Sequence, residues 1–160
     1  MGGDIILHGL ANQYLGFASW AQGDYRRVID CFGQTAVAFK GTMHRERFGQ
    51  VFLPAVLSRA LLAACHAEQG TFSEGSTLGE EGLQIAEAVG HPGSLMWAYY
   101  GIGLLSFHQG TLRRTLPLLK RAIAICQDAD FPAYFPMVAA AMGAAPTPCR
   151  CSRRHWNKPM

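Results

Sequence analysis

The chain of 160 residues is long enough for one domain with a substantial core, and 49% of its residues are hydrophobic. No apolar run reaches the roughly 18 to 20 residues that a membrane-spanning helix needs, and no basic segment precedes a signal-peptide core, so we expect a cytoplasmic protein. The net charge of +3 comes from the last fifteen residues, which contain four basic residues and no acidic one. The rest is nearly neutral, which argues against a nucleic-acid-binding surface.

A pattern around three Gln-Gly pairs recurs along the chain, with its glycines 47 and 40 residues apart. In each copy a small residue lies seven positions before the glycine, and an aromatic residue or Leu lies two positions after it. Such a glycine closes a helix in the left-handed conformation, and the small residue lets two antiparallel helices approach closely. We therefore predict three helix hairpins. The turn glycines are Gly23, Gly70 and Gly110, and the predicted caps of the second helices are Asp24, Thr71 and Thr111.

In chain order, the predicted hairpins cover about residues 5–40, 51–90 and 94–128, and the first helix of a fourth covers 133–145. The second helices carry apolar residues at helical spacing. The fourth repeat begins on schedule, because Gly143 lies 40 residues after Gly103 in the small-residue position. We therefore predict an all-α solenoid of antiparallel hairpins with about seven helices, which forms one domain over residues 1–145.

These turn and helix motifs resemble the tetratricopeptide repeat over about residues 5–145. The spacing exceeds the usual 34 residues of that repeat. In this respect the chain is similar to the long-repeat arrays of large bacterial regulators that carry an ATPase module or a nucleotide cyclase domain, and the run Gly-Glu-Glu-Gly-Leu-Gln-Ile-Ala-Glu at residues 79–87 adds to the likeness. The resemblance implies a non-enzymatic protein-interaction scaffold, a fragment of a sensor array. The chain has no Gly-rich phosphate loop with Lys-Ser/Thr, so the ATPase itself is absent.

In tetratricopeptide stacks the first helix of each hairpin lines a concave groove, which binds an extended or helical peptide. The predicted groove residues are Gln13, Phe17, Trp20, Arg59, Glu68, Trp97, Tyr100, Leu104, Phe107 and His108. The middle hairpin contributes the small side chains of Ala60 and Ala64, so the groove has a hollow with aromatic walls. An alternative function is therefore the binding of a small ligand in this hollow. A further alternative is that the aromatic residues pack between hairpins or in an oligomer interface.

The C-terminal end of the predicted stack exposes apolar residues, because terminal repeats normally need a polar cap and none is present. We therefore expect self-association through this end, as a homodimer. The residues concerned are Tyr134, Phe135, Val138 and Met142.

Residues 146–160 depart from the repeat with a Pro- and Arg-rich basic tail. Two interpretations remain open: a frameshift or gene truncation, and a disordered basic terminus. In this tail, Cys149, Cys151 and His155 offer three candidate ligands where a structural zinc site takes four. The six histidines are scattered, and no nucleophile lies in a catalytic pattern. We therefore expect no catalytic residue, cofactor or metal ion.

Overall fold

The computed structural model describes residues 2–144, so the predicted tail at 146–160 lies outside the described residues. The described chain is entirely helical, with seven α-helices, one short 3₁₀ helix and no strand, which confirms the predicted all-α class. The elements are α1 (Gly2–Ala21), α2 (Tyr25–Ala38), η1 (Gly41–Arg45), α3 (Pro54–Gln69), α4 (Phe72–Val89), α5 (Pro92–His108), α6 (Leu112–Asp128) and α7 (Phe135–Ala144).

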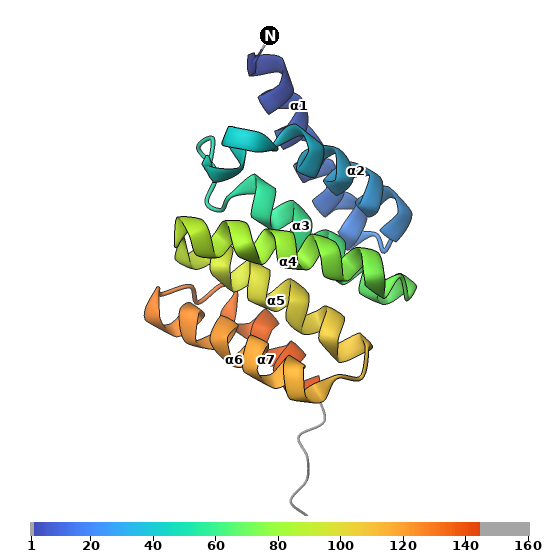
Figure 1. Cartoon of the computed structure of the whole chain (residues 1–160), viewed down its shortest axis with the longest axis vertical. Coiled ribbons are helices and arrows are strands. Elements are labelled where there is room, and N and C mark those ends of the chain that lie inside the picture. The colour runs from blue at the N-terminus through green and yellow to red at the C-terminus, as the bar shows by residue number, and fades with distance from the viewer. Residues whose placement is uncertain (1, 145–160) are drawn as a thin grey trace, which may run out of the picture.

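The helices pack as successive hairpins, in which α1 pairs with α2, α3 with α4, and α5 with α6. The hairpins follow one another along the long axis of the molecule, with α1 at one end and α7 beside α6 at the other (Figure 1). Helix α3 lies at the centre, because it contacts α2 and α5 as well as its own partner α4. Contact between α1 and α3 is slight, which separates the first helix from the rest of the stack.

The three turns within the hairpins share one hydrogen-bonding pattern. Each turn glycine has a positive φ, between 73° and 75°, as its position in the repeat predicts. The residue after each glycine donates its backbone N–H to the carbonyl five residues earlier, at 2.9 to 3.0 Å. This bond belongs to the Schellman motif, which requires a left-handed residue and therefore favours glycine. The donors are Asp24, Thr71 and Thr111, and the acceptors are Ser19, His66 and Ser106.

The predicted helix caps are confirmed for only one of the three turns. Asp24 accepts a hydrogen bond from the backbone N–H of Arg27 at 3.2 Å, as an N-cap does. Thr71 and Thr111 make no such bond to the helices that follow them. Their hydroxyls instead donate backwards, to the last turn of the preceding helix. A threonine hydroxyl can reach either helix, and here it adds a second hydrogen bond to the carbonyl that already accepts the backbone N–H of the same threonine.

Close backbone contact joins the second and third hairpins. A Cβ atom built on Gly101 of α5 would lie 2.5 Å from the carbonyl oxygen of Ala60 and 2.8 Å from its Cα. The glycine therefore lets α3 and α5 touch backbone to backbone. The small residues of the repeat act similarly within hairpins, since Gly16 faces Phe32 and Gly103 faces Leu119. Close packing of this kind holds the helices in a single register.

The C-terminal end differs from the predicted exposed surface. Val138 is fully buried in the main core, and Tyr134 and Phe135 are half-buried against it. Met142 is also half-buried. Helix α7 folds back on α6 and directs its apolar residues inward, so the prediction that this end exposes them is wrong. Within residues 2–144, no helix combines the length and hydropathy that a membrane crossing requires.

Candidate functional site

A cavity of about 220 Å³ lies where the N-terminal halves of α3 and α5 face α1. Helix α1 barely touches α3, which leaves a space between the two helices. Other segments of the chain enclose this space. The chain between η1 and α3 covers one side, and the segment before α7 covers another. The lining residues are Gln13, Tyr14, Phe17, Gln50, Val51, Phe52, Leu57, Trp97 and Tyr134.

Aromatic rings form most of the wall. Phe52 meets Trp97 and Tyr134 edge to face, with ring centroids 6.1 Å and 5.3 Å apart. Trp97 and Tyr134 also meet edge to face, at 5.8 Å, which closes a triangle of three rings. Phe17 contributes a fourth ring from α1, where it packs on Phe32 at 5.4 Å. Edge-to-face contacts are a favoured arrangement for aromatic side chains, so this wall is well ordered.

Two buried polar atoms at the cavity lack a hydrogen-bond partner. They are Oε1 of Gln13 and Nε1 of Trp97, and the two residues are 3% and 6% exposed. Within residues 2–144, only one other buried side-chain polar atom, Oγ of Ser106, is without a partner. Leaving such an atom unpaired costs about 1 to 3 kcal/mol, so buried polar groups normally have partners. Both atoms belong to residues that line the cavity, but each has less than 1 Å² of accessible surface, so neither is exposed to the space inside it.

A hydrogen bond crosses the mouth of the cavity. The hydroxyl of Tyr14 donates to Oε1 of Gln50 at 2.7 Å, which joins α1 to the segment before α3. This segment turns at Phe48 and Gly49, which both have positive φ. Val51 beside it is exposed, whereas Phe52 is buried. Because the bond between Tyr14 and Gln50 is exposed to water, its net contribution to stability is small.

The structure brings together three of the predicted groove residues, Gln13, Phe17 and Trp97, at this cavity. Tyr100 is half-buried and packs edge to face on Trp97 at 5.7 Å. Ala60 and Ala64, the predicted floor of a hollow, are both buried in the core. The hollow thus lies nearer the start of α3 than predicted, beside Leu57.

The remaining predicted groove residues lie elsewhere. Trp20 packs on Tyr25 near the first turn, with ring centroids 5.9 Å apart. Glu68 and His108 come within 3.3 Å of each other at the C-terminal ends of α3 and α5. Phe107 is half-buried beside His108. Leu104 is half-buried as well. This second group lies outside the cavity.

Arg59, which was predicted to line the groove, lies away from the aromatic cavity. Its side chain is buried between α3 and α4, where Nε donates to Oε2 of Glu81 at 3.1 Å. An NH1 proton is donated to the carbonyl oxygen of Ala55 at 2.9 Å. Gly82 of α4 makes room for the Arg59 side chain, because a Cβ there would lie 3.1 Å from that of Arg59. Arg59 therefore joins the two helices of one hairpin.

Several lining residues were not among the predicted groove residues. Tyr14, Gln50 and Phe52 belong to α1 and to the segment that precedes α3, and Tyr134 precedes α7. Phe52 and Tyr134 lie inside the predicted ranges 51–90 and 133–145, but the spacing of the turn glycines contains no signal that these two residues meet.

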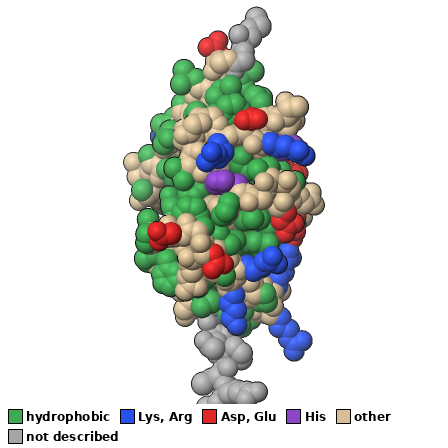
Figure 2. Space-filling model, turned by 90° about the vertical axis from the view of Figure 1, so that its left-hand side faces the viewer, with side chains coloured by type: hydrophobic (Ala, Val, Ile, Leu, Met, Phe, Trp, Pro, Cys, Tyr) green, Lys and Arg blue, Asp and Glu red, His purple; other side chains and the backbone are tan. Residues whose placement is uncertain are grey.

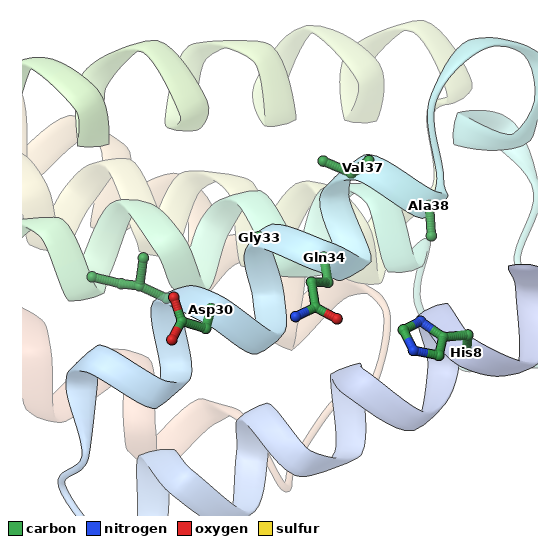
Figure 3. A pocket seen from close by; sticks show the side chains of 7 residues that line it. His8, Asp30, Gly33, Gln34, Val37 and Ala38 are labelled. Atoms are coloured by element: carbon green, nitrogen blue, oxygen red, sulfur yellow. The ribbon is translucent and has the colours of Figure 1, made fainter.

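A larger hollow of about 590 Å³ lies along α2 beside the start of α1 (Figure 3). Figure 3 shows His8 on α1 and Gln34 on α2 on the same side of this groove, with Asp30 farther along α2. Two of its polar residues contact Asn12, whose side-chain amide donates to Oε1 of Gln34 at 3.0 Å and lies 3.1 Å from Nδ1 of His8. The groove is broad, and none of the predicted groove residues lines it.

The shifted pKa values of three residues follow mainly from burial in the helical stack. Burial raises the pKa of the Cys65 thiol to about 12, which keeps it protonated and unreactive near neutral pH. Burial lowers the pKa of His66, which lies 2.7 Å from the hydroxyl of Thr71. Burial and the nearby Arg47 lower the pKa of His91. Nδ1 of His91 accepts the backbone N–H of Ser94 at 3.2 Å and so caps α5.

Within residues 2–144, no three side chains of His, Cys, Asp or Glu lie together as ligands for a metal ion. The candidate ligands Cys149, Cys151 and His155 lie outside the described residues. Comparison of the chain with protein-family models, with curated proteins and with solved structures returned no match. The site is therefore defined by its geometry alone.

Proposed function

We propose that the chain is a non-enzymatic interaction scaffold of the tetratricopeptide kind, which binds a helical protein partner through one face of α1. The outer face of α1 is formed by Leu7, Ala11, Tyr14, Leu15 and Ala18, all of which are exposed. These residues recur at intervals of three, four and seven, so they lie on one side of the helix. Leu7 is 69% exposed and Leu15 is 48% exposed.

The observation that carries this proposal is the lack of charge on α1. In its twenty residues, Asp4 is the one acidic residue, and the helix has no Lys or Arg. A helix face that is exposed to water normally has charged residues, as α6 has with Arg113, Arg114 and Lys120. In Figure 2 the upper end of the molecule, where α1 begins, shows hydrophobic side chains interspersed with uncharged atoms and one acidic group. Exposed apolar side chains on one helix face are typical of a protein interface.

The absence of basic residues from α1 favours a protein partner over a membrane surface. Amphipathic helices that lie on membranes are rich in Lys and Arg on their polar face, and α1 has neither. A second copy of the chain offers a matching surface, because two copies of α1 can pack their uncharged faces across a twofold axis. Self-association through α1 is therefore the form of this proposal that can be tested directly.

Light scattering tests this self-association. The mass of the purified chain should rise from 17.4 kDa towards twice that value as the concentration increases from micromolar to millimolar. Leu15→Glu and Leu7→Glu place a charge on the outer face of α1 and should keep the chain monomeric. Val37→Glu is the matched control, since Val37 is an exposed hydrophobic residue on α2. A wild-type chain that stays monomeric throughout, or equal loss of association in the control, would contradict the proposal.

The resemblance of the repeats to bacterial regulator arrays supports a narrower proposal, that the chain belongs to a sensor array with an ATPase or cyclase module. The parent gene locus tests this proposal. A neighbouring reading frame for such a module would support it, and a locus without one would count against it.

A further inference from the structure

Another cavity, of about 330 Å³, lies where α2 of the first hairpin faces α3 and α4 of the second, and we call it the α2–α4 cavity. Ligand pockets in proteins measure about 300 to 1,000 Å³ and combine an apolar lining with a few polar groups. Here Ile29, Val37 and Leu78 provide apolar side chains that are half-buried or exposed. None of the residues on the outer face of α1 lines this cavity, so it is separate from the proposed partner-binding surface.

The polar lining residues give the α2–α4 cavity one excess positive charge. Lys40, Arg59 and Glu81 line it, so two cations stand against one carboxylate. Burial lowers the pKa of His66, which also lines the cavity, so its imidazole adds no charge at neutral pH. Within residues 2–144, Lys40 makes no ion pair, whereas Glu81 is paired with Arg59. A ligand with one negative charge would therefore balance the lining.

Arg59 has donor groups that the protein leaves unused. Each nitrogen of its guanidinium carries N–H groups, and the structure pairs Nε with Glu81 and Nη1 with the carbonyl oxygen of Ala55. Nη2 has no hydrogen-bond partner among residues 2–144. It is also not one of the fully buried atoms that lack a partner, so it keeps accessible surface. Because the rest of this side chain is buried, Nη2 is a strong donor for an anion that enters the cavity.

We propose that the α2–α4 cavity binds a small monocarboxylate with an apolar body, whose carboxylate contacts Nη2 of Arg59 and the ammonium group of Lys40. The apolar body lies against Ile29 and Leu78. A neutral ligand would leave the buried guanidinium without its acceptor. A phosphate dianion fits less well, because its second charge would face the carboxylate of Glu81 without a cation to balance it.

Titration of the full-length chain with octanoate, 1-octanol and acetate tests this proposal. The chain carries ¹³C-labelled isoleucine and leucine methyl groups, and the signals of Ile29 and Leu78 are followed by NMR. Octanoate has both the apolar chain and the carboxylate, whereas 1-octanol lacks the charge and acetate lacks the chain. Because hydrogen bonds to charged groups contribute more than neutral ones, octanoate should bind about tenfold more tightly than 1-octanol. Acetate should bind more weakly than octanoate, because it buries almost no apolar surface.

Two variants separate the role of Arg59 in ligand binding from its role in the fold. Arg59→Met removes the charge and keeps an unbranched side chain, so octanoate should lose its advantage over 1-octanol. Lys40→Met should reduce this advantage about threefold, because Lys40 is exposed and exposed ion pairs contribute less. Lys120→Met is the matched control, since Lys120 is an exposed lysine on α6 that does not line the cavity. The ratio of the two affinities is the readout, because a purely structural loss would weaken both ligands equally.

Thermal unfolding of each variant without ligand shows whether the fold is intact, and Lys40→Met carries the test if Arg59→Met does not fold. Leu15→Glu, which should prevent self-association through α1, should leave octanoate binding unchanged, so the two proposals fail separately. The proposal is overturned if octanoate leaves the signals of Ile29 and Leu78 unmoved at millimolar concentration, or if 1-octanol binds as tightly. It is also overturned if a folded Arg59→Met keeps the preference for octanoate, or if Lys40→Met reduces it no more than Lys120→Met.

Discussion

Replacing Gly101 with Ala tests the contact between the second and third hairpins. The new Cβ atom would lie 2.5 Å from the carbonyl oxygen of Ala60 and 2.8 Å from its Cα, both backbone atoms that cannot rotate away. Overpacking of a core costs about 1 to 3 kcal/mol, and the upper end applies where backbone must move. Alanine regains about 1 kcal/mol of helix propensity. The net loss in the free energy of unfolding is therefore about 2 kcal/mol.

Urea denaturation followed by circular dichroism measures this loss, and a lower melting temperature, by about 4 to 8 °C, should accompany it. Gly33→Ala is the matched control, because Gly33 also lies within a helix and a Cβ there has no neighbour within 4 Å. The control should gain up to about 1 kcal/mol from helix propensity. If Gly101→Ala were as stable as the control, α3 and α5 would not touch backbone to backbone, and the arrangement of the hairpins would be wrong.

Three further predictions concern single side chains. Because the pKa of His91 is lowered in the folded protein, stability should be complete above the ordinary histidine pKa of about 6.5 and should fall as the pH decreases below it. His91→Asn, which caps the helix without titrating, should weaken this dependence in unfolding measurements at pH 5 and pH 7.5; an unchanged slope would contradict it. Glu81→Ala should destabilise the chain more than Arg59→Met in urea denaturation, because it leaves a buried guanidinium without its carboxylate; the reverse order would refute this reading. Tyr14→Phe removes the exposed hydrogen bond to Gln50 and should change the free energy of unfolding by less than about 1 kcal/mol in urea denaturation, and a larger loss would contradict the small contribution assigned to this bond.

The order of the helices was predictable because each turn is specified locally. A left-handed glycine and its neighbours form a Schellman motif without help from distant residues, so Gly23, Gly70 and Gly110 revealed the hairpins. Within a hairpin the small residue opposite a large side chain is likewise a local signal, as Gly103 opposite Leu119 illustrates.

The cavity was only partly predictable, because it depends on contacts between distant parts of the chain. Phe52 and Tyr134 meet across more than eighty residues of sequence, and the repeat spacing does not relate their positions. Arg59 was assigned to the groove because it is polar and lies on a first helix, yet Glu81 and the small Gly82 on the neighbouring helix draw it to the other side. Val138 was expected to be exposed, and the packing of α7 on α6 buries it.

Intermolecular NOEs between the two copies of the chain in a mixed-label sample test whether the outer face of α1 is the binding surface. One copy carries ¹³C-labelled leucine methyl groups, and the other is unlabelled. We expect NOEs from the methyl groups of Leu7 and Leu15 to protons on α1 of the second copy. The absence of intermolecular NOEs at concentrations where the mass doubles, or NOEs that arise from α7 instead, would contradict the outer face of α1 as the binding surface.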